Sequence, residues 1–176
     1  TDSSNNNNSA SNTFTWTCDT SSPVITGVSL ANDNTTIVVT FDENVFNTNA
    51  GSGSLDVNDF VFSLSGGIAS LSSTTPSSIS INGTQYTLGI SLSGTPNGSE
   101  TLTVNPTLNS IYDIFGHVAS TSQSNNSISL NDKLSPTMVI SSSTVNSGET
   151  SKDSSISLTF TSSENTTNFI QDDITV

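Results

Sequence analysis

Positive charge is almost missing from this sequence. Its 176 residues include only Lys133 and Lys152 as cations, against fifteen aspartates and glutamates, and the formal net charge is −13 at pH 7. Nucleic acids and anionic membranes are bound through lysine and arginine, so this composition predicts no nucleic-acid partner and no binding to an anionic membrane. It also excludes ordinary salt-bridge networks. Carboxylates without basic partners favour a cation as ligand.

Cysteine is present once, as Cys18, which excludes a disulfide within the chain. The alternating segment 14–18 (FTWTC) places Cys18 on the inward face of a strand. Because no basic residue lies nearby to lower its pKa, we expect a small buried hydrophobe rather than a reactive thiol. An intermolecular disulfide remains an alternative.

Histidine is also present once, as His117, so a nucleophile–histidine–acid arrangement would have to be built on a residue in a turn-like loop. A hydrolase with paired carboxylates could use Glu43 and Asp113, but the sequence suggests no cleft around them. Phosphate-binding glycine motifs are absent. We therefore expect that the chain is not an enzyme.

Long apolar runs and helical periodicity are both missing. No segment is apolar enough to cross a bilayer, and none has the form of a signal peptide. We expect an interior portion of a larger secreted product, extracellular or at the cell surface, whose export signal and anchor lie elsewhere. Alternating segments rich in β-branched residues predict an all-β fold.

The clearest alternating segment is 36–45 (TIVVTFDENV), which runs from an apolar strand into Asp42 and Glu43. A similar segment at 155–165 (SISLTFTSSEN) ends at Glu164. The inward residues are Ile37, Val39 and Phe41 in the first segment and Ile156, Leu158 and Phe160 in the second. One type of strand is therefore used twice, as expected in a modular array.

Two linkers give the length of the repeat. Residues 19–23 (DTSSP) and 132–136 (DKLSP) place their prolines 113 positions apart (136 − 23), about the length of one immunoglobulin-like sandwich. We expect residues 19–132 to be one complete module. Residues 1–18 would then be a polar loop and the terminal strand, 13–18, of a preceding module, and residues 133–176 would be the first strands of a following one.

The expected strands can be placed from alternation and turn residues. In the complete module they are 24–30, 36–41, 60–64, 68–71, 78–81, 85–92, 101–105 and 126–130, and in the following module 138–141, 155–160 and 173–176. Asn82-Gly83 predicts a tight hairpin. The partial modules would need strands from the same polypeptide, which we favour, or from an identical chain by strand addition.

Several short motifs resemble the bacterial Ig-like repeats of giant surface adhesins, which also occur in surface proteins of ciliated protists. They are the Asp-x-x-x-Pro linkers, the strand ending Phe-x-Glu at residues 41–43, residues 57–62 (VNDFVF) and residues 111–117 (IYDIFGH). His117 departs from the asparagine of the family's usual Asp-x-x-Gly-Asn. Residues 139–176 look like the opening of a second, related Ig-like subtype.

The resemblance implies antiparallel Ig-like β-sandwich modules in tandem, one complete and two partial, and it transfers no catalytic residue. We expect a structural segment of an extended extracellular rod or filament, whose partners are neighbouring modules of the same or an identical chain. The alternative is an adhesin module that binds a surface glycan or protein through its loops. A ligand site of that kind would need exposed aromatic residues, and most aromatics here are predicted to face inward.

In a sandwich of this kind, three loops return to the pole next to the N-terminal linker and bring acids together there. The acids are Asp19, Asp42, Glu43, Asp59 and Asp113, and the equivalents in the following module are Asp132, Glu164, Asp172 and Asp173. Ca²⁺ takes about six to eight oxygen ligands, which clustered carboxylates can supply. We therefore expect Ca²⁺ at the module junctions. The alternative is that these acids are solvated, form turns or cap strand ends.

Six Asn-x-Ser/Thr sequons predict N-glycosylation if the source is eukaryotic. They lie in predicted turns or loops, at Asn7, Asn34, Asn82, Asn97, Asn125 and Asn165. In a chain this rich in asparagine, serine and threonine, some sequons arise by chance.

Overall fold

A computed structural model describes residues 3–5, 15–16 and 18–175. These residues form eleven strands and two short 3₁₀ turns, and contain no α-helix. The prediction of an all-β fold is confirmed. None of the described segments forms a helix with the length and apolarity needed to cross a bilayer.

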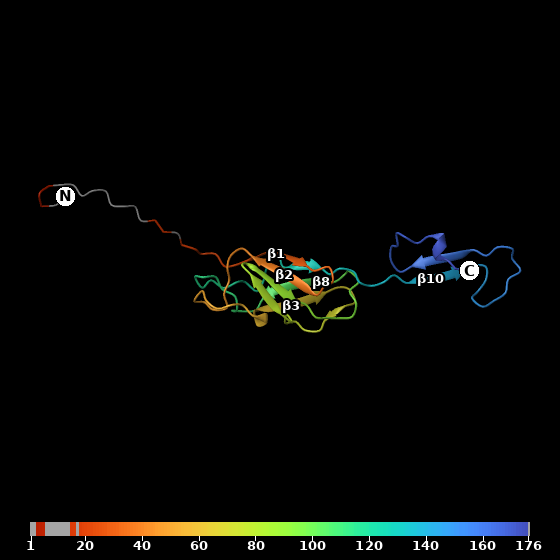
Figure 1. Cartoon of the computed structure of the whole chain (residues 1–176), viewed down its shortest axis with the longest axis horizontal. Helices are drawn as coiled ribbons and strands as arrows, with labels where there is room; N and C mark the ends of the chain where they lie inside the picture. The colour runs from red at the N-terminus through yellow and green to blue at the C-terminus, as the bar shows by residue number, and fades with distance from the viewer. Residues whose placement is uncertain (1–2, 6–14, 17, 176) are drawn as a thin grey trace.

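Two antiparallel sheets make up residues 25–130 (Figure 1). The first has the order β1-β2-β6-β5, and the second has the order β3-β8-β9. The bounds are β1 Ile25–Leu30, β2 Thr36–Phe41, β6 Gln85–Gly89 and β5 Ile79–Asn82 for the first sheet, and β3 Phe60–Ser65, β8 Thr101–Pro106 and β9 Ser127–Ser129 for the second. A short ribbon pairs β4 (Ser70–Leu71) with β7 (Leu92–Ser93).

The core forms where these sheets face each other, and both contribute side chains to one buried cluster. Ile37, Val39 and Phe41 of β2 alternate inward as predicted. Phe41 meets Tyr86 edge to face with ring centroids 5.8 Å apart, a favoured aromatic geometry. The core of the sandwich therefore depends on β2, the segment in which the alternation of apolar and polar residues is clearest.

The predicted strand 85–92 is interrupted, because β6 ends at Gly89 and Leu92 joins the β4–β7 ribbon instead. The amide of Gly89 donates to the carbonyl of Ser78 (2.9 Å), and a Cβ at Gly89 would lie only 2.4 Å from Ser77 Oγ. This close approach redirects the chain. The nearby hairpin turn is also one residue later than predicted, because Asn82 pairs with Gln85 and Gly83 takes the positive φ of +60°.

Beyond the sandwich, β10 (Met138–Ser142) and β11 (Leu158–Ser162) form a separate hairpin toward the C-terminus (Figure 1). The second strand thus begins later than the predicted 155–160. In place of a strand at 173–176, residues Gln171–Asp173 form the 3₁₀ turn η2, and Val176 lies outside the described residues.

The predicted N-terminal strand, 13–18, lies only partly within the described residues, because positions 13, 14 and 17 are outside them. Thr15, Trp16 and Cys18 do not lie in a strand. Cys18 is exposed, so its predicted burial is wrong in this structure. Neither sheet of residues 25–130 includes Cys18, so no strand pairing buries the thiol.

Candidate functional site

The best-defined polar cluster is built on a tight turn in the connection between β8 and β9. The Asp113 Oδ1 atom accepts the amides of Phe115 (2.8 Å) and His117 (2.7 Å), and the Asp113 amide donates to the His117 carbonyl (3.0 Å). Gly116 has φ +92°, and a Cβ there would lie 2.6 Å from the carbonyl oxygen of Asn49. The turn therefore fixes Asp113 and His117 in one orientation.

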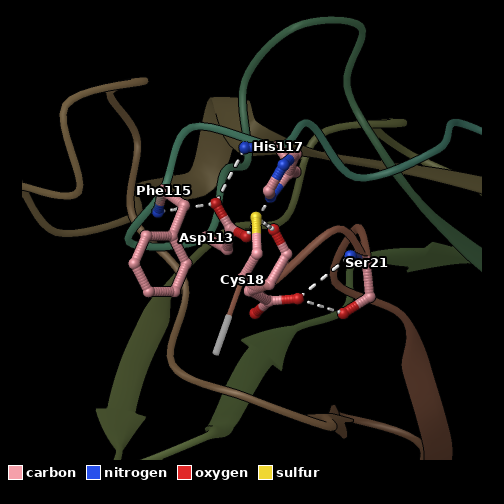
Figure 2. A network of polar contacts seen from close by, with 6 residues as sticks. Cys18, Ser21, Asp113, Phe115 and His117 are labelled. Carbon is pink, nitrogen blue, oxygen red and sulfur yellow. Dashed lines mark hydrogen bonds and ion pairs between the residues drawn. The ribbon is translucent and has the colours of Figure 1, made fainter. Parts of the chain in front are cut away.

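The His117 imidazole closes this turn through its side chain (Figure 2). Its Nδ1 lies 2.6 Å from Asp113 Oδ2, and Asp113 is fully buried. Burial alone would raise the pKa of Asp113, but the bonds from His117 and Phe115 outweigh it and lower that pKa. The bond to Asp113 raises the pKa of His117. The nearby Cys18 thiol donates instead to the backbone oxygen of Asp19 (3.5 Å).

Two further acids reach this turn from other segments. One carboxyl oxygen from each of Asp19, Glu43 and Asp113 lies within 4.8 Å of the others. Asp19 is held by the hydroxyl (2.6 Å) and the amide (3.0 Å) of Ser21, which lower its pKa. Burial raises the pKa of Glu43, and the charges of Asp113, Asp42 and Asp19 raise it further. The structure thus brings together three of the five acids predicted at this pole.

The other two predicted acids cap backbone ends. Asp42 Oδ1 accepts the amide of Val24 (2.9 Å), at the start of β1. Asp59 Oδ2 accepts the amide of Asp56 (2.7 Å) at the 3₁₀ turn η1 (Val57–Asp59), and burial raises the pKa of Asp59. Asp42 and Asp59 therefore fit the alternative interpretation, in which these acids cap the ends of strands and turns.

The second linker repeats part of this arrangement. The Leu134 amide donates to Asp132 Oδ1 (2.9 Å), as the Ser21 amide does to Asp19. Burial and the neighbouring Asp132 carboxyl raise the pKa of Glu164. Asp172 is exposed, and Asp173 Oδ2 accepts the Ile170 amide (3.0 Å), as Asp59 does at η1. Within the described residues, only the first linker has three acids in one group.

The hydrogen bonds that follow each linker also correspond. The Asp42 amide donates to the Val24 carbonyl (3.1 Å), and the Ser163 amide donates to the Thr137 carbonyl (2.9 Å). In return, the Val24 amide donates to Asp42 Oδ1 and the Thr137 amide donates to Ser163 Oγ, both at 2.9 Å. The linker positions differ by 113 (137 − 24), and the strand ends differ by 121 (163 − 42). The second hairpin therefore repeats the first with a longer connecting loop.

The sequons differ in their surroundings. Asn34 is only 3% exposed, and its Nδ2 donates to the carbonyl of Asn131 (2.8 Å). Because this side chain is buried and hydrogen-bonded, the folded sandwich offers no room for a glycan at Asn34. Asn82, Asn125 and Asn165 are exposed, Asn97 is half-buried, and Asn7 lies outside the described residues.

Glu100 is a buried carboxylate that the sequence analysis did not single out. Its Oε1 accepts the amides of Ile68 (2.8 Å) and Ala69 (3.0 Å), and Oε2 accepts the amide of Asn97 (3.1 Å). Burial alone would raise its pKa, but these bonds outweigh it and lower the pKa to about 2. The adjacent Gly66-Gly67 turn was the available signal, because the amides of a tight turn need an acceptor, and Ala69 directly after this turn is buried.

Large apolar side chains are exposed beside the acidic cluster. Ile114 and Phe115 project from the Asp113 turn and are 59% and 66% exposed. The prediction that most aromatics face inward holds for Phe41, Phe60, Phe62 and Tyr86, which are buried. It fails at Trp16, Phe115 and Phe169, which are exposed. At Phe115 the hydrogen bonds of the turn fix the backbone with this side chain outward.

Comparison of the chain with protein-family models, with curated proteins and with solved structures found no match.

Proposed function

We propose that this chain is a structural repeat segment of a large secreted or cell-surface protein, in which sandwich modules join end to end as a rod or filament. The observation that carries the proposal is the recurrence, at the second linker and hairpin, of the hydrogen bonds made at the first. Such recurrence is expected when each linker begins a new copy of one module.

The sheet order supports an Ig-like module. The order β1-β2-β6-β5 opposite β3-β8-β9 is the arrangement of a constant-type immunoglobulin sandwich, with strands A, B, E and D facing C, F and G. On this proposal residues 19–132 form the complete module, and residues 133–176 begin the next. The resemblance of the linker and loop motifs to adhesin repeats agrees with this order and supports an extracellular location.

Electron microscopy of the purified native protein that carries this sequence tests the proposal. We expect evenly spaced globules in a straight or gently curved row, because hydrogen bonds hold the second linker near both of its ends, to the sandwich and to the hairpin. The amide of Lys133 donates to Pro96 of the sandwich (2.9 Å), and that of Thr137 donates to Ser163 of the hairpin. A single isolated globule would refute the array.

We further propose that Ca²⁺ binds at the first junction. The three clustered carboxylates fit a hard cation, which prefers oxygen ligands, and Asp19, Glu43 and Asp113 would hold it. Bound Ca²⁺ would neutralise their mutual repulsion and tie the linker to the module. Asp113 already accepts three hydrogen bonds, including that from His117, so His117 competes with the ion for this carboxylate.

Thermal unfolding with added CaCl₂ or with a chelator tests the calcium proposal. We expect Ca²⁺ to raise Tm in the unmodified chain, because a ligand that binds only the folded state stabilises it. Glu43→Gln should reduce this increase. Asp42→Asn is the matched control, since asparagine keeps an oxygen acceptor for the Val24 amide. An unchanged Tm in both solutions would sink the idea.

N-linked glycans are proposed only for sequons whose asparagine is exposed, at Asn82, Asn125 and Asn165. Intact-mass measurement of the 176-residue chain, expressed by secretion from a eukaryotic host cell, should then show an excess over the 18.2 kDa of the bare chain. Peptide mapping should find no glycan on Asn34. A mass with no excess removes the claim.

The alternative function, an adhesin module that binds a glycan or protein, is favoured by one observation. Ile114 and Phe115 are exposed on a hydrogen-bonded turn, and exposed aromatic side chains are typical of ligand contacts. A glycan array and a pull-down from a cell-surface protein extract test this alternative. Phe115→Ala should abolish any binding, whereas Leu108→Ala, also at an exposed apolar residue, should not. Equal loss in both variants would contradict a site at this turn.

A further inference from the structure

The C-terminal hairpin exposes apolar side chains to solvent. Val139 and Ile140 of β10 and Leu158 of β11 are all more than half exposed. Strand β11 pairs with β10 along one edge, and its other edge is unpaired in the part of the chain that the structure describes. An unpaired edge beside apolar side chains is a template for another strand.

The first hairpin indicates which strand belongs there. The shared hydrogen bonds align Ser163 with Asp42, so Leu158 and Phe160 of β11 occupy the positions of Ile37 and Val39 in β2. The sequence pattern agrees, because Leu-Thr-Phe in β11 repeats the alternation of Ile-Val-Val in β2.

The same positions differ sharply in burial. Ile37 and Val39 are 0% exposed, whereas Leu158 is 53% exposed. In the sandwich, β6 pairs with the second edge of β2, with Ile37 opposite Leu88 and Val39 opposite Tyr86. The strand that the second hairpin lacks at this edge is therefore the counterpart of β6.

The amides of β11 point in the required direction. Ser163 donates to Thr137 beside β10, so the alternation of an antiparallel ladder turns the amides of Leu158, Phe160 and Ser162 away from β10. Ser162 aligns with Phe41, whose amide donates to Thr84 at the start of β6 (3.0 Å). Three backbone donors on the free edge of β11 thus match those that β6 satisfies in the sandwich.

We propose that the free edge of β11 binds one antiparallel, uncharged strand of β6 type, with an aromatic and an aliphatic residue two positions apart. The aliphatic residue lies opposite Leu158 and the aromatic residue lies opposite Phe160, as Leu88 and Tyr86 lie opposite Ile37 and Val39. Strand β11 carries no charge, which suits an uncharged partner strand. The inference rests on the proposed tandem array, in which the module that begins after residue 132 places a strand of β6 type at this edge, as the first module does.

Hydrogen exchange of the whole chain, followed by NMR, tests the proposal with a blocked synthetic peptide of residues 83–91 (GTQYTLGIS). At saturating peptide we expect exchange at the amides of Leu158, Phe160 and Ser162 to slow by about tenfold, as for an edge occupied about nine-tenths of the time. The amides of Thr159 and Thr161 point toward β10, so their exchange rates should not change. This alternation separates strand addition from general stabilisation.

Two controls test the chemistry of the strand. A peptide in which Tyr86 and Leu88 are replaced by serine keeps the backbone donors and acceptors but should give no protection. In the chain, Leu158→Ser should weaken the effect, and Thr159→Ser, on the opposite face of β11, should not.

Three results would overturn the proposal. The first is that hydrogen exchange does not slow at about 1 mM peptide, a concentration at which even a site with a Kd of about 1 mM is half occupied. The second is equal slowing of exchange by the serine-substituted peptide, and the third is protection without peptide that grows with the concentration of the chain. The last would assign the edge to a second copy of the chain. A row of globules by electron microscopy together with any of these results would overturn this inference alone and leave the array intact.

Discussion

Removal of the Glu100 carboxylate is expected to destabilise the sandwich more than removal of any exposed acid. In Glu100→Ala, the buried carboxylate that accepts the amides of Ile68, Ala69 and Asn97 is lost. A buried donor left without a partner costs about 1–3 kcal/mol. Allowing for partial rearrangement of the turns, we expect a loss of about 3–5 kcal/mol, a large part of the about 5–15 kcal/mol typical of a domain.

Differential scanning calorimetry of the whole chain measures this loss. In a module of this size 1 kcal/mol shifts Tm by about 4 °C, so Glu100→Ala should lower Tm by about 12 °C or more. Glu149→Ala is the matched control, because it removes the same charge from an exposed side chain. Equal effects of the two variants would refute the assigned role of the Glu100 hydrogen bonds.

The pH dependence tests the same contact. The pKa of Glu100 is lowered to about 2 from a usual value near 4.5, so between these values the unfolded chain binds more protons at this site than the folded chain. Its stabilising contribution is therefore complete above about pH 4.5 and is lost as the pH falls toward about 2. Glu100→Gln should show a shallower acid slope than the unmodified chain. An identical slope in both would contradict the lowered pKa.

Three further predictions concern other parts of the molecule. NMR titration should give His117 a pKa above its usual value near 6.5, and Asp113→Asn should lower that pKa. The same His117 pKa in both proteins would contradict the ion pair with Asp113. Asn34→Ala should cost about 1–3 kcal/mol in chemical denaturation, because it removes the acceptor and donor that hold Asn131. Ile37→Ala should cost about 2–5 kcal/mol, whereas Leu158→Ala, at the equivalent but exposed position, should cost well under 1 kcal/mol; similar costs would contradict the unequal burial of the two hairpins.

Much of the fold follows from local sequence pattern. Strand β2 occupies the predicted residues 36–41, because strict alternation and its acidic end mark both face and boundary. The other boundaries are less accurate where side-chain pattern is not decisive. Strand β6 ends early because Gly89 must approach Ser77 and Ser78 closely, a contact between segments that no local pattern reveals.

The candidate site was predictable in part. Loop directions in a sandwich indicate that Asp19, Glu43 and Asp113 share a pole, and the structure places them together. The same reasoning includes Asp42 and Asp59, whose side chains instead accept nearby amides. Loop topology gives the end of the module at which an acid lies, but hydrogen bonding decides whether its carboxylate is free to bind an ion.

The sequence alone determined the all-β class, the alternating strands and the recurrence of the linker, because these depend on residue type and on spacing along the chain. Tertiary structure decided which polar groups meet. It paired His117 with Asp113, buried Glu100 beneath two turns and held Asn34 against Asn131. It also distinguished β2 from β11, two strands of similar pattern, because burial depends on which other strands pack against a strand and its own sequence does not specify them.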